Sequence, residues 1–241
     1  MMIAVMMRIF AGLALGALLA TTASAAPVGK AEAAERDDAN VPAYVLKLLP
    51  DGRALSLVGG IRFGLARDLD RALAASPGIK TIYLTSPGGR LAAAEEAAEF
   101  ITRRGLNTYV PGECSSACTR VFVAGKRRTL LNGARLGFHS ANFTNPMPLP
   151  GAMRWLANQV SIGEYIGAGV DRGFMERALS IAPKNVWYPS AGVLLAAHVI
   201  TGVTDGLDFG VSGYEKPKWY GKDGDGGYPA AQRVFQETHG K

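Results

Sequence analysis

The 241-residue sequence is poor in cysteine: only Cys114 and Cys118 are present, and both fall within one five-residue stretch. A framework of several disulfides is therefore excluded, and a chain of this length can build a hydrophobic core without one. With 48% apolar residues, the composition also argues against a disordered or a collagen-like protein. We expect one globular domain of ordinary composition.

The sequence also lacks any strong charge of one sign. Its 26 Lys+Arg residues outnumber its 20 Asp+Glu residues only modestly. The basic residues are spread along the chain, and the run Lys126-Arg127-Arg128 is only three residues long. Such a balance is typical of a solvated surface, so we expect no nucleic-acid partner.

Long hydrophobic runs are missing except at the start. Arg8 precedes an apolar stretch that begins at Ile9, and Ala23-Ser24-Ala25 supplies the small residues of a cleavage site. The apolar stretch of about 15 residues is shorter than the ~20 residues of a spanning helix, which disfavours the alternative of a retained membrane anchor. The pattern predicts a signal peptide over residues 1–25, cleaved near Ala25, and a periplasmic or secreted protein. That compartment holds no ATP and permits disulfides.

The rest of the chain divides into three parts. Residues 26–41 have no apolar period and predict a disordered lead, residues 42–212 form the domain, and residues 213–241 predict a flexible tail. Within the domain, strand and helix patterns alternate, which favours an α/β fold of parallel strands with crossing helices. Helices are predicted over residues 65–75, 91–104, 153–167, 172–182 and 191–197, and strands over residues 45–49, 53–61, 81–85, 107–110, 120–124, 134–139 and 199–203.

Three features carry residues suited to chemistry. Ser86-Pro87-Gly88-Gly89 ends a predicted buried strand, where free backbone N–H groups could face an oxyanion, although a plain turn has the same pattern. Small residues from Gly112 to Cys118 form a bend that could present a serine hydroxyl, or merely a Ser-Ser helix cap. His139 ends the strand predicted over residues 134–139, as either a general base or a structural histidine.

In order and spacing these motifs resemble those of the proteolytic subunit of Clp protease, within the ClpP/crotonase-like superfamily. That family has an S-P-G-G strand end, a G-x-A-A-S-M-G bend, an A-G-x-x-G-K-R segment and an R-V-M-I-H strand. The sequence matches them at residues 86–89, 112–118, 124–127 and 135–139, and the resemblance spans roughly residues 45–205. The Cys114-Ser115-Ser116-Ala117-Cys118 bend is most similar to the C-x-S-x-C bend of the Clp-like predicted periplasmic proteins.

The resemblance implies a single α/β domain of the ClpP/crotonase-like fold and a Ser-His site. Ser116 falls on the nucleophile and His139 on the general base, while the amides of Gly89 and Ala117 fall on the oxyanion hole. Ser115 falls on an alanine of the family motif. The family has a helix after the serine, and we follow the resemblance there, although residues 120–124 favour a strand by residue type.

The third catalytic position departs from the family. An aspartate stands there in Clp subunits, whereas here Asn185 is the best match, with Asp171 and Asp205 as candidates that lack motif support. An amide oxygen can orient an imidazole but stabilises its charged form less than a carboxylate does. A catalytically impaired binding or scaffold protein of the periplasm is therefore the alternative to an enzyme.

Other chemistries are less consistent with the sequence. A Ser-Lys dyad is disfavoured because no lysine occurs between Lys126 and Lys184, and export would separate a crotonase from coenzyme A. Cys114 and Cys118 could form a local disulfide or remain buried thiols, and both are favoured over a metal site with His139. We expect no metal and no cofactor.

These observations together predict an exported, ATP-independent serine hydrolase, most similar to a peptidase. Its substrate would be a peptide or another acyl compound, and no ATPase partner is expected outside the cytoplasm. Residues 153–167 fall where Clp subunits make ring contacts, so the resemblance also allows a homo-oligomer.

Overall fold

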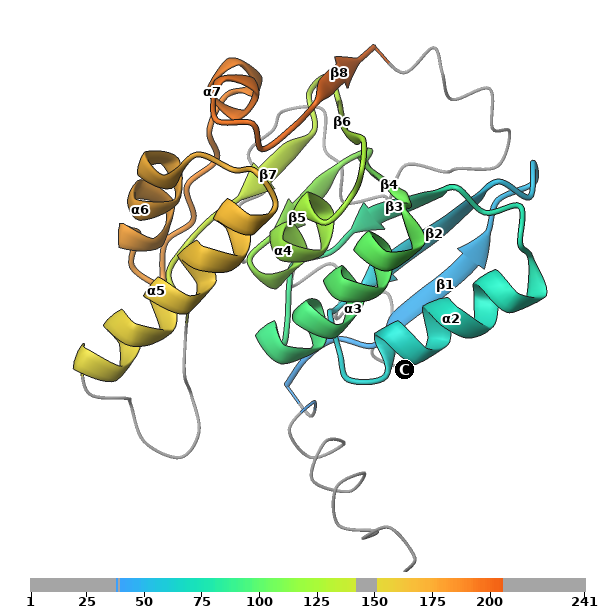
Figure 1. Ribbon diagram of the computed structural model, residues 1–241, viewed down its shortest axis with the longest axis horizontal. Coiled ribbons are helices and arrows are strands. Elements are labelled where there is room, and N and C mark those ends of the chain that lie inside the picture. The colour runs from blue at the N-terminus through green and yellow to red at the C-terminus, as the bar shows by residue number, and fades with distance from the viewer. Residues whose placement is uncertain (1–37, 39, 142–150, 206–241) are drawn as a thin grey trace, which may run out of the picture.

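A computed structural model of the chain describes residue 38 and residues 40–141 and 151–205 (Figure 1). The predicted signal peptide, most of the predicted lead and the predicted tail lie outside the described residues. The last residues of the lead are placed: Asp38 is buried, and the Phe63 N–H donates a hydrogen bond to its carboxylate at 3.1 Å.

The main sheet contains six strands in the order β1-β2-β3-β4-β6-β8. The pair β1–β2 is antiparallel, and every other pair in this sheet is parallel. The remaining strands, β5 and β7, form a separate two-stranded parallel sheet. The strands are β1 (Tyr44–Leu48), β2 (Ala54–Gly59), β3 (Thr81–Thr85), β4 (Asn107–Val110), β5 (Glu113–Ser115), β6 (Arg128–Leu131), β7 (Arg135–Gly137) and β8 (Gly202–Thr204).

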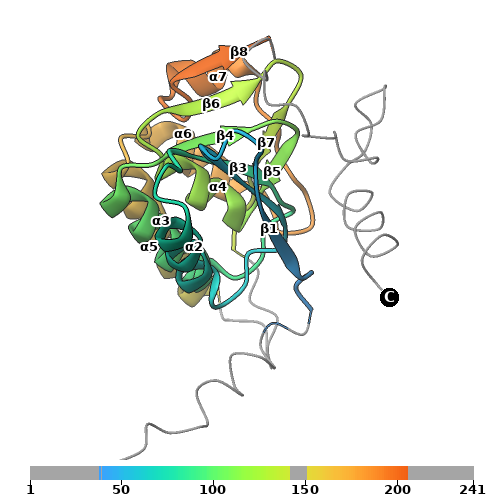
Figure 2. The ribbon, with the colours of Figure 1, turned by 90° about the vertical axis from the view of Figure 1, so that its right-hand side faces the viewer.

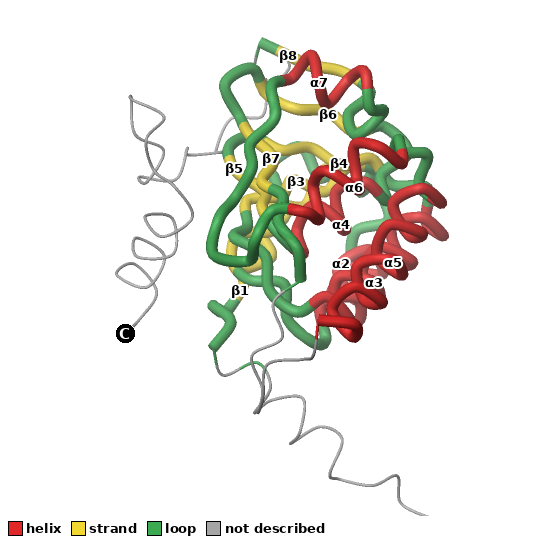
Figure 3. The backbone as a smooth tube through the Cα atoms, turned by 90° about the vertical axis from the view of Figure 1, so that its left-hand side faces the viewer, coloured by secondary structure: helices red, strands yellow, loops and turns green. Residues whose placement is uncertain are grey.

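Helices connect the parallel strands and cover one side of the main sheet. Figures 2 and 3, which view the molecule from opposite sides, both place α2, α3 and α5 together on that side. This is the α/β architecture that the alternation of patterns predicts. The helices are α2 (Leu65–Ala75), α3 (Leu91–Arg104), α4 (Ala117–Val123), α5 (Gly151–Gly167), α6 (Arg172–Ser180) and α7 (Ala191–Ala196).

Alternation along the strands divides the core between the two faces of the sheet. Ile82 and Leu84 of β3 point into the large cluster beneath the helices. Tyr83, between them, belongs to a smaller cluster, in which its ring lies 4.8 Å from that of Tyr109. Helix α3 approaches the large cluster closely because the side chains on its buried face are small, mainly alanines at positions 93, 94, 97 and 98.

The structure has a helix, α4, where residue type favours a strand, and it contains two strands that the sequence patterns did not predict. Residues 120–124, strand-like by residue type, lie in or next to a helix, as the resemblance implied. Val121, Phe122 and Val123 are consecutive and all buried, so the sequence of this helix shows no helical period. Strands β5 and β6 were not predicted, since three or four residues carry too little alternation to stand out.

Candidate active site

Ser116 occupies a strained bend between β5 and α4. It has φ 55° and ψ −131°, a conformation that non-glycine residues adopt rarely and that recurs at functional sites. Hydrogen bonds hold it there: the Ser116 N–H donates to the Gly137 carbonyl at 2.8 Å, and the Ser116 carbonyl accepts from the Thr119 hydroxyl at 2.7 Å. The side chain of Ser116 is partly exposed and lines a cavity of about 530 Å³.

Ser115 is placed quite differently from Ser116. It is fully buried, it does not line the cavity, and its hydroxyl donates to the carboxylate of Glu113 at 2.8 Å. Of the two serines in the bend, the structure therefore brings only Ser116 to the cavity.

The loop after β3 lies against the serine. Gly88 has φ 103°, and a Cβ at this position would lie 2.6 Å from the Ser116 Cβ and 3.1 Å from the Ala117 nitrogen. Only glycine allows this approach. Ile61 pairs with the loop by accepting from the Arg90 N–H and donating to the Gly88 carbonyl, both at 2.8 Å.

This pairing sets the direction of the Gly89 amide. Because residues 88 and 90 make both bonds to Ile61, the N–H of Gly89 points away from Ile61. Ala117 is the first residue of α4, where N–H groups have no partner within the helix. Both residues line the cavity beside Ser116. They are suited to stabilise an oxyanion, as the resemblance implied.

His139 lines the same cavity. Strand β7 runs parallel to β5 with Ser115 opposite Gly137. Ser116, directly after β5, and His139, two residues after β7, therefore lie at the same end of the small sheet. Phe138 and Trp187 exchange two backbone hydrogen bonds of 2.9 Å, and the Ser140 N–H donates to the Ile181 carbonyl at 2.8 Å. The imidazole Nδ1 of His139 lies 2.7 Å from the carbonyl oxygen of Ser140.

The three side chains considered for the third catalytic position are not brought to this cavity. Asn185 is exposed and does not line it, although Pro183 does. Asp171 caps α6 by accepting from the Phe174 N–H at 2.7 Å. Asp205 follows β8 and accepts from Asn132 at 3.1 Å.

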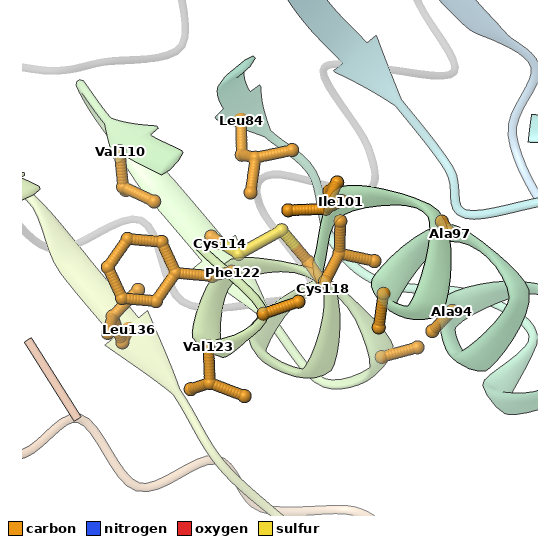
Figure 4. Packing of buried hydrophobic residues seen from close by; sticks show 14 of the residues in the cluster. Leu84, Ala94, Ala97, Ile101, Val110, Cys114, Cys118, Phe122, Val123 and Leu136 are labelled. Atoms are coloured by element: carbon orange, nitrogen blue, oxygen red, sulfur yellow. A yellow bond between two sulfur atoms is a disulfide. The ribbon is translucent and has the colours of Figure 1, made fainter. Parts of the chain in front are cut away.

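Cys114 and Cys118 form a disulfide across the serine bend. Because Cys114 lies in β5 and Cys118 in α4, the change of direction at Ser116 brings their Cα atoms to 5.3 Å, as a disulfide requires. Figure 4 shows the bridge packed among buried side chains that include Leu84, Ile101 and Phe122. Both cysteines are fully buried, so the bridge ties the strand before Ser116 to the helix after it.

A buried carboxylate, which the family motifs do not indicate, lies behind the bend. Glu113 accepts two hydrogen bonds from Arg135, at 2.8 and 3.0 Å, and one each from Ser115 and Tyr188, both at 2.8 Å. The pKa of Tyr188 is raised by burial and by the negative charge of Glu113. The network joins β5, β7 and the segment that follows α6. An acid one residue before the C-x-S-x-C bend and a basic residue at the start of the histidine strand were the available signals.

A second acidic cluster lies between α3, α4 and α5. Arg120 holds Glu95 with two contacts of 2.8 Å, and Glu164 shares a hydrogen bond with Glu95. Burial, followed by the hydrogen bond and charge of Glu95, raises the pKa of Glu164 to about 7. The next residue, Tyr165, lines the cavity and shares a 2.7 Å hydrogen bond with Thr119, so this cluster adjoins the back wall of the site.

The rest of the cavity wall is largely apolar. It includes Phe63, Leu91, Phe138 and Leu179, and residues 40–42 of the N-terminal segment complete it. Residues 38, 40–141 and 151–205 contain no cluster of three His, Cys, Asp or Glu side chains that could hold a metal ion. Within the same ranges, no helix combines the length and apolar character needed to cross a bilayer.

The chain has a ClpP-like fold. Two structures of ClpP1 from Listeria monocytogenes match it. A point mutant matches with a TM-score of 0.53 and 17% identity over 66% of this chain and 94% of that chain. The other ClpP1 structure matches with a TM-score of 0.51 and 16% identity over the same shares. No protein-family model and no curated protein matches the sequence. At this level of sequence identity, the structural similarity shows the fold alone.

Proposed function

We propose that the protein is an exported serine hydrolase of the peptidase type, with Ser116 as nucleophile and His139 as general base. The observation that carries the proposal is the position of Ser116: a positive-φ serine stands in one cavity with a histidine and with the amides of Gly89 and Ala117. These are the parts that acyl transfer by a serine requires. ClpP structures share the fold, which supports a protease-like activity.

In the proposed reaction, the Ser116 Oγ attacks the substrate carbonyl while its proton passes to Nε2 of His139. The carbonyl π electrons move to the oxygen, which the N–H groups of Gly89 and Ala117 stabilise. The intermediate collapses, His139 returns the proton to the leaving amine or alcohol, and an acyl-enzyme remains. Water then attacks the acyl-enzyme with His139 again as base, which releases the acid and frees Ser116.

The cavity supports an acyl substrate with an apolar side chain next to the reacting carbonyl. Its volume of about 530 Å³ and its walls of Phe63, Leu91, Phe138 and Leu179 suit one or two such side chains. We therefore propose peptides with apolar residues before the scissile bond as the first substrates to test. No ATPase partner is part of the proposal.

Labelling with a fluorophosphonate probe tests the activity. The mature protein should label, Ser116→Ala should abolish labelling, and His139→Ala should slow it by about a hundredfold or more, the range of general base catalysis. Ser180→Ala is the matched control, since Ser180 is exposed on α6 outside the cavity. Absence of Ser116-dependent labelling would favour the alternative, a catalytically impaired binding or scaffold protein.

Export is a further part of the proposal and rests on the pattern of residues 1–25. Fractionation of cells that express the full chain should recover the mature protein outside the cytoplasm. N-terminal sequencing should read Ala26 first. A cytoplasmic protein that retains Met1 would contradict it.

The proposed function also includes self-association of the chain. Helix α5 exposes Met153, Trp155, Leu156 and Val160, which lie on the segment that the resemblance places at ring contacts. We propose that a second copy of the chain covers this face. Light scattering should detect an oligomer that Leu156→Glu dissociates, while Arg154→Glu on the same helix should not. A monomeric mature protein would refute this part.

A further inference from the structure

We infer that the backbone carbonyl of Ser140, rather than the side chain of Asn185, orients the imidazole of His139. The inference rests on the proposed function, because it concerns the general base of that reaction. It assigns to a main-chain carbonyl the role that a side-chain acceptor has in a catalytic triad.

The hydrogen bond between His139 and the Ser140 carbonyl can have only one direction. The His139 Nδ1 and the Ser140 carbonyl oxygen are 2.7 Å apart. A carbonyl oxygen has no proton, so it can only accept, and Nδ1 must carry the hydrogen. In the neutral imidazole the lone pair is then on Nε2. This is the tautomer that a general base needs in order to take a proton from Ser116.

The second step is the rigidity of the acceptor. Ser140 is 5% exposed, and its N–H is bonded to the Ile181 carbonyl at 2.8 Å. On the other side of the histidine, Phe138 is paired twice with Trp187 at 2.9 Å. Backbone hydrogen bonds therefore hold the chain on both sides of His139, which positions the Ser140 carbonyl without a dedicated side chain.

The third step is the placement of the competing acceptors. Asn185 is exposed and absent from the cavity wall, while Asp171 and Asp205 are engaged at the start of α6 and beside Asn132. The buried carboxylate of Glu113 is occupied by Arg135, Ser115 and Tyr188.

The consequence is a base with the right tautomer, whose Nδ1–H faces a carbonyl dipole in place of a carboxylate charge. A carbonyl dipole stabilises the imidazolium less than a carboxylate does, so turnover should be slow compared with that of a triad. The sequence departs from the family at the third position because, on this inference, that position no longer serves the histidine.

The tautomer can be observed directly by nitrogen NMR of the ¹⁵N-histidine-labelled mature protein, with the His139 signals assigned by comparison with His139→Gln. We expect one neutral tautomer, protonated at Nδ1, in both the wild type and Asn185→Ala. An Nε2–H tautomer, a mixture of both, or a change of tautomer in Asn185→Ala would overturn the inference. Because this readout needs no activity, its result is separate from that of probe labelling.

Two variants extend the test to the reaction. Asn185→Ala should keep the rate of fluorophosphonate labelling within about threefold, and a loss of a hundredfold or more would assign the role to Asn185. Replacement of Ala141 by lactic acid converts the Ser140–Ala141 amide to an ester, whose carbonyl accepts hydrogen bonds more weakly. This variant should lower the labelling rate about tenfold and introduce the Nε2–H tautomer, and an unchanged tautomer would overturn the inference.

Discussion

Replacement of Glu164 by glutamine should stabilise the protein at alkaline pH and leave its stability unchanged at acid pH. Burial and the neighbouring Glu95 raise the pKa of Glu164 from 4.5 to about 7, so the folded state holds this proton more tightly than the unfolded chain does. The stabilisation by the protonated form is complete below pH 4.5 and is lost as the pH rises from there to about 7.

The magnitude follows from the two pKa values. At about 1.4 kcal/mol for each tenfold change in proton affinity, the loss is at most about 3.5 kcal/mol. Glu164 is only partly buried, so solvent screening reduces the figure to about 1 kcal/mol. Glutamine mimics the protonated acid and should recover this amount at pH 8 but nothing at pH 4.5.

Urea unfolding at the two pH values measures the difference. The free energy of unfolding of Glu164→Gln should exceed that of the wild type by about 1 kcal/mol at pH 8 only. Glu99→Gln on α3 is the matched control, because Glu99 makes an exposed ion pair with Arg103 and should show no such pH dependence. A destabilised Glu164→Gln protein at pH 8, or an equal gain at both pH values, would refute the reasoning.

The remaining predictions concern the serine bend. Gly88→Ala should lower the labelling rate of Ser116 by about a hundredfold, because the new Cβ displaces the nucleophile, while Gly163→Ala, on open α5, should not. Replacement of both cysteines by alanine should lower the unfolding free energy in urea by about 2 kcal/mol, since the bridge closes only a short loop; a loss below 0.5 kcal/mol would contradict a structural role. Glu113→Gln should cost at least about 2 kcal/mol by the same assay, because a buried charge network loses its anion.

The parts of the fold with strong periodicity were predictable to the residue. The helices over residues 65–75 and 91–104 and the strand over residues 81–85 have the predicted bounds, because their apolar positions repeat clearly and Gly105 ends the second helix in a left-handed conformation. Strand β8 begins at Gly202 rather than at Val199, although Val199 and Ile200 are buried as a strand pattern implies. A run of apolar residues indicates that a segment is buried, but it does not determine which residues pair in a sheet.

Some features of the candidate site could also be predicted from the sequence, and others could not. Motif order alone pointed to Ser116, His139, Gly89 and Ala117, and all four residues line one cavity, while their catalytic roles stay predictions. The Ser140 carbonyl could not be predicted, because every residue carries a carbonyl and only the pairing of the chain around His139 aims this one. Motif order also favoured Asn185, whose exposure depends on the turn in which its N–H bonds to the Ala182 carbonyl.

The most direct test of the account is to locate the probe on the chain. Mass spectrometry of the fluorophosphonate-treated mature protein should find one adduct, on Ser116, and none in Ser116→Ala. An adduct on Ser115 or another residue, or labelling that persists without Ser116, would contradict the assignment of the nucleophile. The same protein left unlabelled, although folded, would contradict the proposal that it is a serine hydrolase.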